Sequence, residues 1–177
     1  MTRAFVGMGS NLGDRLGNLA AALAALEASP GITVAAVSRV YESEPWGVAD
    51  QPAFANVVVA LDTTLGAQAL LSACKRIETG LGRTRGLRYG PRAIDLDVLL
   101  FGDEAVDTPE LTVPHPRLLE RDFVVTPLLE VAPGVTLPGG APLTRDGAVQ
   151  GRVTGILSER LLPATGPGAC GDGPPTS

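Results

Sequence analysis

Residues that build redox, zinc and histidine-based metal sites are scarce in this 177-residue sequence. It has two cysteines and one histidine, and the placement of Cys74 and Cys170 suggests neither a disulfide framework nor a zinc site. No apolar run approaches the length of a membrane span, and the N-terminus lacks the basic-then-apolar layout of a signal peptide. We therefore expect a cytoplasmic protein that does not engage a membrane.

Positive charge is also limited, because 14 Lys and Arg residues stand against 19 Asp and Glu, for a net charge of −5. This balance argues against a general nucleic-acid binder, whose affinity depends on many phosphate-neutralising cations. The arginines concentrate between Arg83 and Arg92 and again at Arg117 and Arg121. Local cationic patches on an acidic chain suit a small anionic ligand better than a polymer.

The length and an apolar share of 45% suit a single domain, which we place at residues 1–163 and expect to act as a monomer. Residues 164–177 are rich in Gly, Pro, Thr and Ser and cannot bury enough apolar surface to offset the entropy of ordering. We expect them to form a disordered tail.

Hydrophobic periodicity predicts alternating strands and helices, the first helix capped by Asp14. In chain order the expected strand, helix, strand, strand, helix and strand are 4–9, 16–26, 32–41, 54–61, 65–81 and 94–101. This order predicts an α+β fold with a ferredoxin-like βαββαβ core. Loops 42–53 and 82–91 are long enough to be binding or catalytic loops. In a C-terminal extension, we expect Thr126-Pro127 to open a short helix and 135–137 to form a strand.

Two carboxylates, Asp95 and Asp97, stand two residues apart in the last of these strands. Side chains at i and i+2 share a strand face, so the two carboxylates can converge. The opposite face would carry Ile94, Leu96, Val98 and Leu100. Converging carboxylates in a half-buried sheet repel each other unless a cation lies between them, and Mg²⁺ usually takes one or two protein carboxylates plus substrate phosphates.

Four arginines precede the acidic pair, at positions 83, 85, 88 and 92. Guanidinium groups grip phosphate oxygens, so the acids and arginines together predict Mg²⁺-dependent phosphoryl chemistry on a nucleotide. The alternative is a solvated acidic pair on an open strand face.

Other motifs leave two readings open. Gly7, Gly9 and Gly13 lie between a strand and a helix with the spacing GxGxxxG, which does not match a dinucleotide-binding fingerprint and fits a tight turn that packs the helix on the sheet. His115, between two prolines, is either a ligand or a surface residue. Trp46 and Phe54 either cover the core or form a stacking platform, to which Asn56 would add an amide on the same strand face.

Taken together, four motifs in register resemble the 6-hydroxymethyl-7,8-dihydropterin pyrophosphokinases of folate biosynthesis. They are Gly9-Ser-Asn-Leu-Gly13, Gln51-Pro52-x-Phe54-x-Asn56, Arg88-Tyr-Gly-Pro-Arg92-x-Ile-Asp95-Leu-Asp97 and Val113-Pro-His115-Pro-Arg-x-x-Glu-Arg121-x-Phe123. The resemblance runs from about residue 3 to about residue 138. It implies transfer of the β,γ-diphosphate of ATP to the hydroxymethyl group of the pterin, with release of AMP, on a ferredoxin-like core with long catalytic loops.

The resemblance also implies roles for individual residues. Asp95 and Asp97 would hold two Mg²⁺ ions, and Arg83 and Arg92 would stabilise the transferring phosphoryl charge. ATP would be held by His115 and Arg121 and lined by Glu78, Arg85, Val98 and Thr112, with Tyr89 in the place where the family commonly has a tryptophan. Phe54 and Phe123 would sandwich the pterin, while Asn56 and the backbone at Ser43, Glu44 and Trp46 would read its edge.

The sequence departs from the family pattern mainly on the nucleotide side. The arginine loop is one residue shorter between Arg83 and Tyr89, Glu110 and Pro116 stand where some members carry Arg and Tyr, and Ser43-Glu44 replaces Thr-Pro. Two rival functions stay open, a Mg²⁺-dependent phosphohydrolase and a non-catalytic ferredoxin-like ligand-binding module. Of these functions, only pterin binding requires the paired aromatic rings of Phe54 and Phe123.

Overall fold

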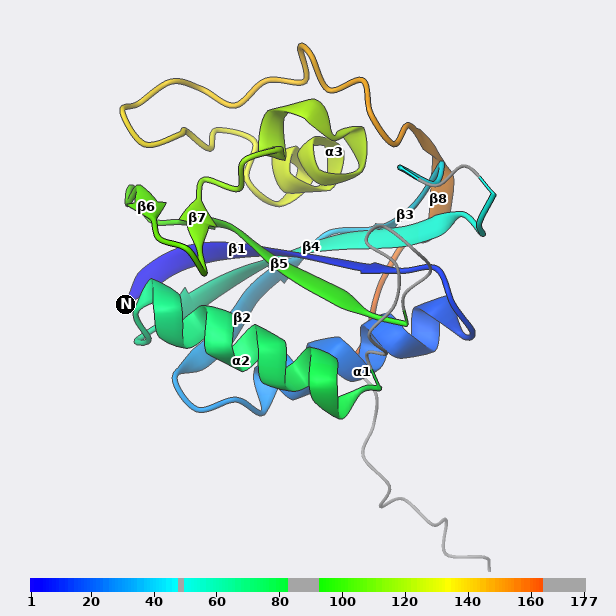
Figure 1. The fold of residues 1–177 in the computed structure, drawn as a ribbon, viewed down its shortest axis with the longest axis horizontal. Coiled ribbons are helices and arrows are strands. Elements are labelled where there is room, and N and C mark those ends of the chain that lie inside the picture. Colours follow the sequence, from blue (N-terminus) through cyan, green and yellow to red (C-terminus); the bar gives the residue numbers. More distant parts are fainter. Residues whose placement is uncertain (48–49, 83–92, 164–177) are drawn as a thin grey trace, which may run out of the picture.

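A computed structural model of the protein describes residues 1–47, 50–82 and 93–163. Its main element is a six-stranded sheet with α1 and α2 on one face and α3 on the other (Figure 1). The elements are β1 (Thr2–Ser10), α1 (Arg15–Glu27), β2 (Ile32–Val37), β3 (Val40–Ser43), β4 (Phe54–Thr63), α2 (Ala67–Gly80), β5 (Asp95–Phe101), β6 (Val106–Asp107), β7 (Thr112–Val113), a 3₁₀ turn (Leu118–Glu120), α3 (Asp122–Val131) and β8 (Val153–Ser158). The predicted α+β class is confirmed.

The sheet has the order β5-β1-β4-β3-β8, with β2 also paired to β4, and its paired strands run antiparallel. β1 therefore lies between β5 and β4. Its residue Gly7 is opposite Asp97 on one side, and Gly9 is opposite Asp95 on that side and Asn56 on the other. This register brings the carboxylate strand and the amide strand to either side of two glycines.

Apolar side chains form one cluster on each face of the sheet. The larger cluster joins the sheet to α1 and α2 and includes Leu23, Leu70 and Leu96. The smaller cluster lies toward α3 and includes Phe5 and Leu128. The alternation of side chains along each strand gives both faces a core, which fixes the sheet between its two helical layers. No helix in the described part of the chain is long and apolar enough to cross a membrane.

The first helix follows the sequence prediction closely. Its N-cap is Asp14, whose carboxylate accepts a 3.0 Å hydrogen bond from the Gly17 amide. The predicted strand 32–41 is instead two strands, because between Val37 and Tyr41 the chain has one residue more than the β4 segment that it faces. Buried Ser38 occupies the break, where its hydroxyl accepts from the amide of Val58 and its own amide donates to the Val58 carbonyl.

Four apolar residues at 94–100 were predicted on the face opposite the two aspartates, and three of them lie there. Ile94, Leu96 and Val98 belong to the cluster toward α1 and α2, but Leu100 belongs to the cluster toward α3. The cause is an irregularity in the pairing with β1, which leaves Leu99 without a Cα partner and reverses the alternation beyond it. The two aspartates precede the irregularity, so their shared face is unaffected.

The C-terminal predictions need correction. Thr126-Pro127 does not open a helix, because α3 begins at Asp122 and contains Pro127 in its second turn. The proline removes one backbone donor, whereas burial of Val124, Val125 and Leu128 on the same helix favours continuing it. Residues 135–137 form an isolated bridge between Thr136 and Pro142 and no strand. The strand of this region, β8, was not predicted, because its half-exposed residues show no clear alternation.

Candidate active site

A cavity of about 440 Å³ opens on the α3 side of the sheet. Its walls come from β1, β3, β4, β5, the segment that follows β7, and the start of α3. Ten of the residues predicted for the site line it, namely Ser43, Glu44, Trp46, Phe54, Asn56, Asp95, Asp97, His115, Arg121 and Phe123. Residues up to 80 positions apart in the sequence thus meet around one space.

Three predicted nucleotide contacts do not line this cavity. Glu78 is buried in α2, Val98 is buried on the opposite face of β5, and Thr112 is exposed on β7. Their predicted contact with ATP stays a prediction. The four other predicted residues, Arg83, Arg85, Tyr89 and Arg92, lie outside the described residues.

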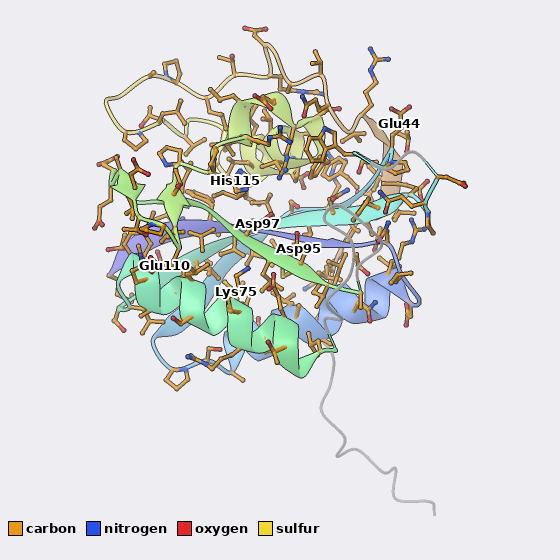
Figure 2. All side chains as sticks on the ribbon, in the orientation of Figure 1. Glu44, Lys75, Asp95, Asp97, Glu110 and His115 are labelled. Atoms are coloured by element: carbon orange, nitrogen blue, oxygen red, sulfur yellow. The ribbon has the colours of Figure 1, made fainter. Side chains whose placement is uncertain are left out.

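The acidic wall of the cavity is formed by β5. Asp95 and Asp97 lie along this strand with His115 on its α3 side (Figure 2). Between the two acids, the amide of Leu96 donates a 2.8 Å hydrogen bond to the buried carboxylate of Glu78, which ties the strand to α2. Burial raises the pKa of Asp97 to about 7, the charge of Asp95 adds to the rise, and Arg121 opposes it. Asp97 therefore holds a proton more readily than an exposed aspartate does.

His115 is oriented by the backbone on both sides. Its amide donates to the carbonyl of Leu99 at 3.0 Å, and its ring atom Nδ1 accepts from the amide of Arg117 at 3.1 Å. An accepting Nδ1 places the proton of the neutral ring on Nε2. Burial lowers the pKa of His115 to about 4, and the charges of Arg121 and Arg117 lower it further against the opposing effect of Asp95. At neutral pH the ring is an uncharged donor through Nε2.

The amide of Asn56, on β4, lies across β1 from the acidic wall. Its nitrogen donates to the Ser43 hydroxyl at 2.7 Å and to the Tyr41 carbonyl at 3.4 Å. Because the Tyr41 carbonyl can only accept, the NH₂ group must point toward it, and this fixes the amide orientation. The side-chain oxygen lies beside Gly9, where an added Cβ would stand 3.4 Å from it. Asn56 thus offers an oriented acceptor to the cavity.

Aromatic rings and guanidinium groups meet at the cavity mouth. The guanidinium carbon of Arg117 lies 4.4 Å from the centre of the Trp46 ring, and that of Arg121 lies 4.9 Å from it. Arg121 also lies 5.6 Å from the centre of the Phe123 ring. These cation–π contacts hold the start of the loop after β3 against the segment that leads into α3. Trp46 therefore belongs to the site and does not act as core cover.

Two glycines of β1 form part of the cavity lining that the sequence reading missed. Gly7 and Gly9 were expected at the end of the strand 4–9, where a tight turn begins, and were given no role in the site; β1 runs on to Ser10, and both residues line the cavity. A Cβ on Gly7 would stand 3.4 Å from the Leu99 side chain. Their two-residue spacing could have revealed this role, because it places both glycines on the same strand face and leaves that part of the face without side chains.

The turn that follows β1 holds the end of the neighbouring loop through side chains. Asn11 is buried and donates to the Gln51 side chain at 3.0 Å and to the Pro52 carbonyl at 3.2 Å. Arg15 donates to the Ala53 carbonyl at 2.9 Å. These bonds fix the end of the 44–53 loop directly before Phe54 enters β4.

Comparison with known proteins gives a family. Residues 5–133 match the model of the 7,8-dihydro-6-hydroxymethylpterin-pyrophosphokinase (HPPK) family, which is well over half of the chain. The chain belongs to this family. A relative from Methylorubrum extorquens, named 2-amino-4-hydroxy-6-hydroxymethyldihydropteridine pyrophosphokinase, is 48% identical over 139 residues, covering 78% of this chain and 88% of the relative. A relative of the same name from Bacillus subtilis is 47% identical over 128 residues, covering 72% of this chain and 77% of the relative.

Solved structures share the fold. An HPPK-DHPS protein in complex with substrates superposes with a TM-score of 0.67 at 14% sequence identity. The alignment covers 83% of this chain and 42% of that chain, so the chain spans about two-fifths of the larger protein. An HPPK-DHPS triple mutant from Plasmodium falciparum gives a TM-score of 0.66 at 16% identity, covering 83% and 41% of the two chains. At these identities the likeness concerns the fold alone.

Proposed function

We propose that this protein transfers the diphosphate of ATP to 6-hydroxymethyl-7,8-dihydropterin, giving AMP and the pterin diphosphate in folate biosynthesis. Family membership and the names of relatives at nearly half identity support the activity. The single observation that carries it is the cavity, which sets a carboxylate pair opposite an oriented amide and aromatic rings. A diphosphate donor and a flat heterocycle need these two kinds of surface.

The residues of the acidic wall fit Mg²⁺. Asp95 and Asp97 open to one cavity, and burial together with the charge of Asp95 raises the pKa of Asp97, so a cation bound between them would relieve their repulsion. A pair of carboxylates agrees with Mg²⁺, which takes few protein ligands and several phosphate oxygens. When bound there, two Mg²⁺ ions would neutralise the oxygens of the triphosphate.

The residues around the acidic wall bind and orient the nucleotide. His115 presents its Nε2 proton to a phosphate oxygen, and Arg121 adds a positive charge on the same side of the cavity. Arg83 and Arg92 keep the role implied by the sequence, stabilisation of charge on the transferring group. The hydroxyl of the pterin attacks the β-phosphorus in line with departure of AMP, so positioning and electrostatics supply most of the rate and no protein nucleophile is required.

The opposite wall recognises the acceptor. Phe54 and Phe123 stack on the two faces of the pterin, and the oriented oxygen of Asn56 accepts from an N–H group on its edge. The backbone at Ser43, Glu44 and Trp46 supplies further hydrogen bonds to that edge. This wall is the feature that a simple phosphohydrolase would lack.

We also propose a ferredoxin-like βαββαβ core, supported by the order β5-β1-β4 with β2 and β3 both paired to β4. The segment from the 3₁₀ turn to β8 forms a C-terminal extension of this core. A single domain over 1–163, a monomeric state and a cytoplasmic location remain predictions of the sequence. Residues 164–177, the predicted tail, lie outside the described residues.

The deciding experiment incubates the purified protein with ATP, Mg²⁺ and 6-hydroxymethyl-7,8-dihydropterin. AMP and pterin diphosphate formed in equal amounts support the proposal, and omission of Mg²⁺ should abolish both. Formation of ADP, or of AMP without pterin, would support the phosphohydrolase. Pterin binding without turnover under any metal condition would support the non-catalytic module.

A further inference from the structure

The chain that enters β8 lies outside the family match, which ends at residue 133. It nevertheless hydrogen-bonds to the start of α3 and to the residue after β3, two places that border the cavity. The amide of Gln150 donates to the carbonyl of Glu120, and the amide of Asp122 donates to the carbonyl of Gln150, each at 2.9 Å. On the other side, the amide of Glu44 donates to the carbonyl of Arg152 at 3.0 Å. The segment 150–153 therefore joins the start of α3 to the end of β3.

Asp122 anchors this segment. The residue is buried, and one carboxylate oxygen accepts from the Thr126 hydroxyl at 2.7 Å and from the Arg145 guanidinium at 3.0 Å. The other oxygen accepts from the amide of Val153 at 2.9 Å. Hydrogen bonds to a buried carboxylate hold both partners in place, because breaking any one of them leaves a desolvated group without compensation.

Gly151 is pressed against the ring of Phe123. A Cβ on this residue would stand 2.3 Å from Cδ1 and 2.6 Å from Cε1 of the ring, distances that no real Cβ contact occupies. Its φ is +58°, a backbone conformation that glycine adopts without strain. Phe123 lines the cavity, packs against the apolar cluster toward α3 and has the guanidinium carbon of Arg121 5.6 Å from its ring centre. The absence of a side chain at 151 thus lets the backbone approach the Cδ1–Cε1 edge of the ring.

We propose that Gly151 is a positioning residue for pterin recognition: its backbone, anchored through Asp122, supports the Phe123 ring in the orientation that stacks on the heterocycle. The inference rests on the proposed function, since it takes the ligand beside Phe123 to be a pterin. Any larger side chain at 151 displaces the ring toward the cavity and narrows the space for a flat bicyclic ligand. On the nucleotide side, Arg121 pairs with Gln150 in an isolated bridge, but Gly151 itself lies against Phe123, so we expect Gly151→Ala to act on pterin binding and to leave ATP binding nearly unchanged.

Gly147 provides a matched control for backbone strain. It also has a positive φ, +89°, and lies in the same C-terminal segment, but a Cβ there would meet no atom within 4 Å. Gly147→Ala therefore introduces a strained L-residue without touching the ring. A difference between Gly151→Ala and Gly147→Ala measures the contact with Phe123 and not the general cost of alanine at positive φ.

The test measures KM for pterin and for ATP, together with the Kd of 6-hydroxymethylpterin by calorimetry. Gly151→Ala should raise the KM and Kd of the pterin about tenfold and leave the KM of ATP within about twofold, whereas Gly147→Ala should leave all three within about twofold. In a Phe123→Leu background, Gly151→Ala should add less than about twofold, because the ring through which it acts is gone.

Several outcomes would overturn the inference: equal effects at 151 and 147, a parallel rise in the KM of ATP, or an undiminished effect of Gly151→Ala beside Phe123→Leu. If Gly151→Ala does not fold, Arg145→Ala loosens the anchor from a side chain that is 61% exposed and should raise the KM of the pterin alone by about twofold to threefold. An unchanged KM would count against the anchor. A wild type that binds 6-hydroxymethylpterin but transfers no diphosphate would refute the proposed function alone.

Discussion

The two walls of the cavity are built in opposite ways. The acidic wall is one short strand, β5, whose two carboxylates share a face through their spacing alone, and burial together with the charge of Asp95 raises the pKa of Asp97. The pterin wall combines β3, β4 and the start of α3, and its polar groups already bond to one another, as Asn56 does with Ser43. One wall is a single strand with a pair of carboxylates, and the other combines several elements and is partly ordered by its own hydrogen bonds.

This contrast has consequences for how each wall works. Two carboxylates that repel each other gain strongly from an incoming cation, so the acidic wall depends on what binds there. Side chains that are held by hydrogen bonds within the protein, as Asn56 is, are ordered before the ligand arrives and lose little entropy on binding. We therefore expect variants of the acidic wall to change catalysis and metal dependence, and variants of the pterin wall to change the affinity of the acceptor.

The largest effect should come from Asp97→Asn. Loss of this carboxylate removes a predicted metal ligand, so kcat should fall by about 10³-fold or more while the KM of the pterin changes little. The control is Asp107→Asn, which removes an exposed carboxylate on β6 outside the cavity and should leave both parameters unchanged. Steady-state kinetics with varied Mg²⁺ measures the difference. Near-wild-type turnover in Asp97→Asn would refute the assignment of the acidic wall.

The same variant should change how stability depends on pH in the metal-free protein. The pKa of Asp97 in the fold is about 7, above its ordinary value of 3.8, so the native state keeps a proton that the unfolded chain releases. The wild type should therefore lose stability relative to Asp97→Asn as the pH rises from 4 to 7, reaching a difference of up to about 4 kcal/mol above pH 7. Urea unfolding of both proteins across this range measures it. A constant difference would contradict the raised pKa.

The acidic wall was predictable from the sequence because its geometry is local. The i and i+2 rule placed Asp95 and Asp97 together, and the cap at Asp14 was equally visible. The pterin wall required a family resemblance, since Asn56 and Phe123 lie 67 positions apart and meet only through tertiary packing. No local signal marked the contact of Gly151 with Phe123. A glycine in an irregular segment can be required for several structural reasons, and the sequence does not distinguish them.

The irregularities of the sheet could not be predicted from the sequence for a different reason. The break at Ser38 and the unpaired Leu99 each arise from a register difference between two strands, which depends on the partner strand as much as on the strand itself. The helix at Asp122 was misplaced because a proline is a strong local signal that burial of its neighbours can override. Local rules therefore failed where long-range pairing or packing decided the structure.

A smaller effect should follow from Asn56→Ala, which tests the pterin wall. The KM of the pterin should rise about thirtyfold while the KM of ATP stays within about twofold, because the lost acceptor faces only the heterocycle. The variant also loses bonds to Ser43 and Tyr41, which should lower the free energy of unfolding by about 1–3 kcal/mol. Steady-state kinetics and urea unfolding measure the two effects.

Asn18→Ala separates affinity from stability in that experiment. Asn18 donates to the Ser10 hydroxyl at 3.2 Å and to the Leu12 carbonyl at 2.9 Å, and it does not line the cavity. Its removal should lower stability and leave the KM of the pterin unchanged. A similar rise in that KM in both variants would mean that Asn56 acts through the fold and not through contact with the ligand.

The smallest of the three effects should come from Gly9→Ala, which lies at the boundary of the two walls. Gly9 is opposite Asp95 on one side and Asn56 on the other, and a Cβ there would stand 3.4 Å from the Asn56 oxygen. The added methyl group enters the space where hydroxymethyl and phosphate must meet, so kcat should fall and the KM of the pterin should rise, each by about threefold to fivefold. Gly155→Ala is the control, a glycine of β8 whose Cβ would meet nothing within 4 Å. If Gly9→Ala changed only one parameter, the two walls would act independently; a joint change means that the reacting groups meet over this glycine.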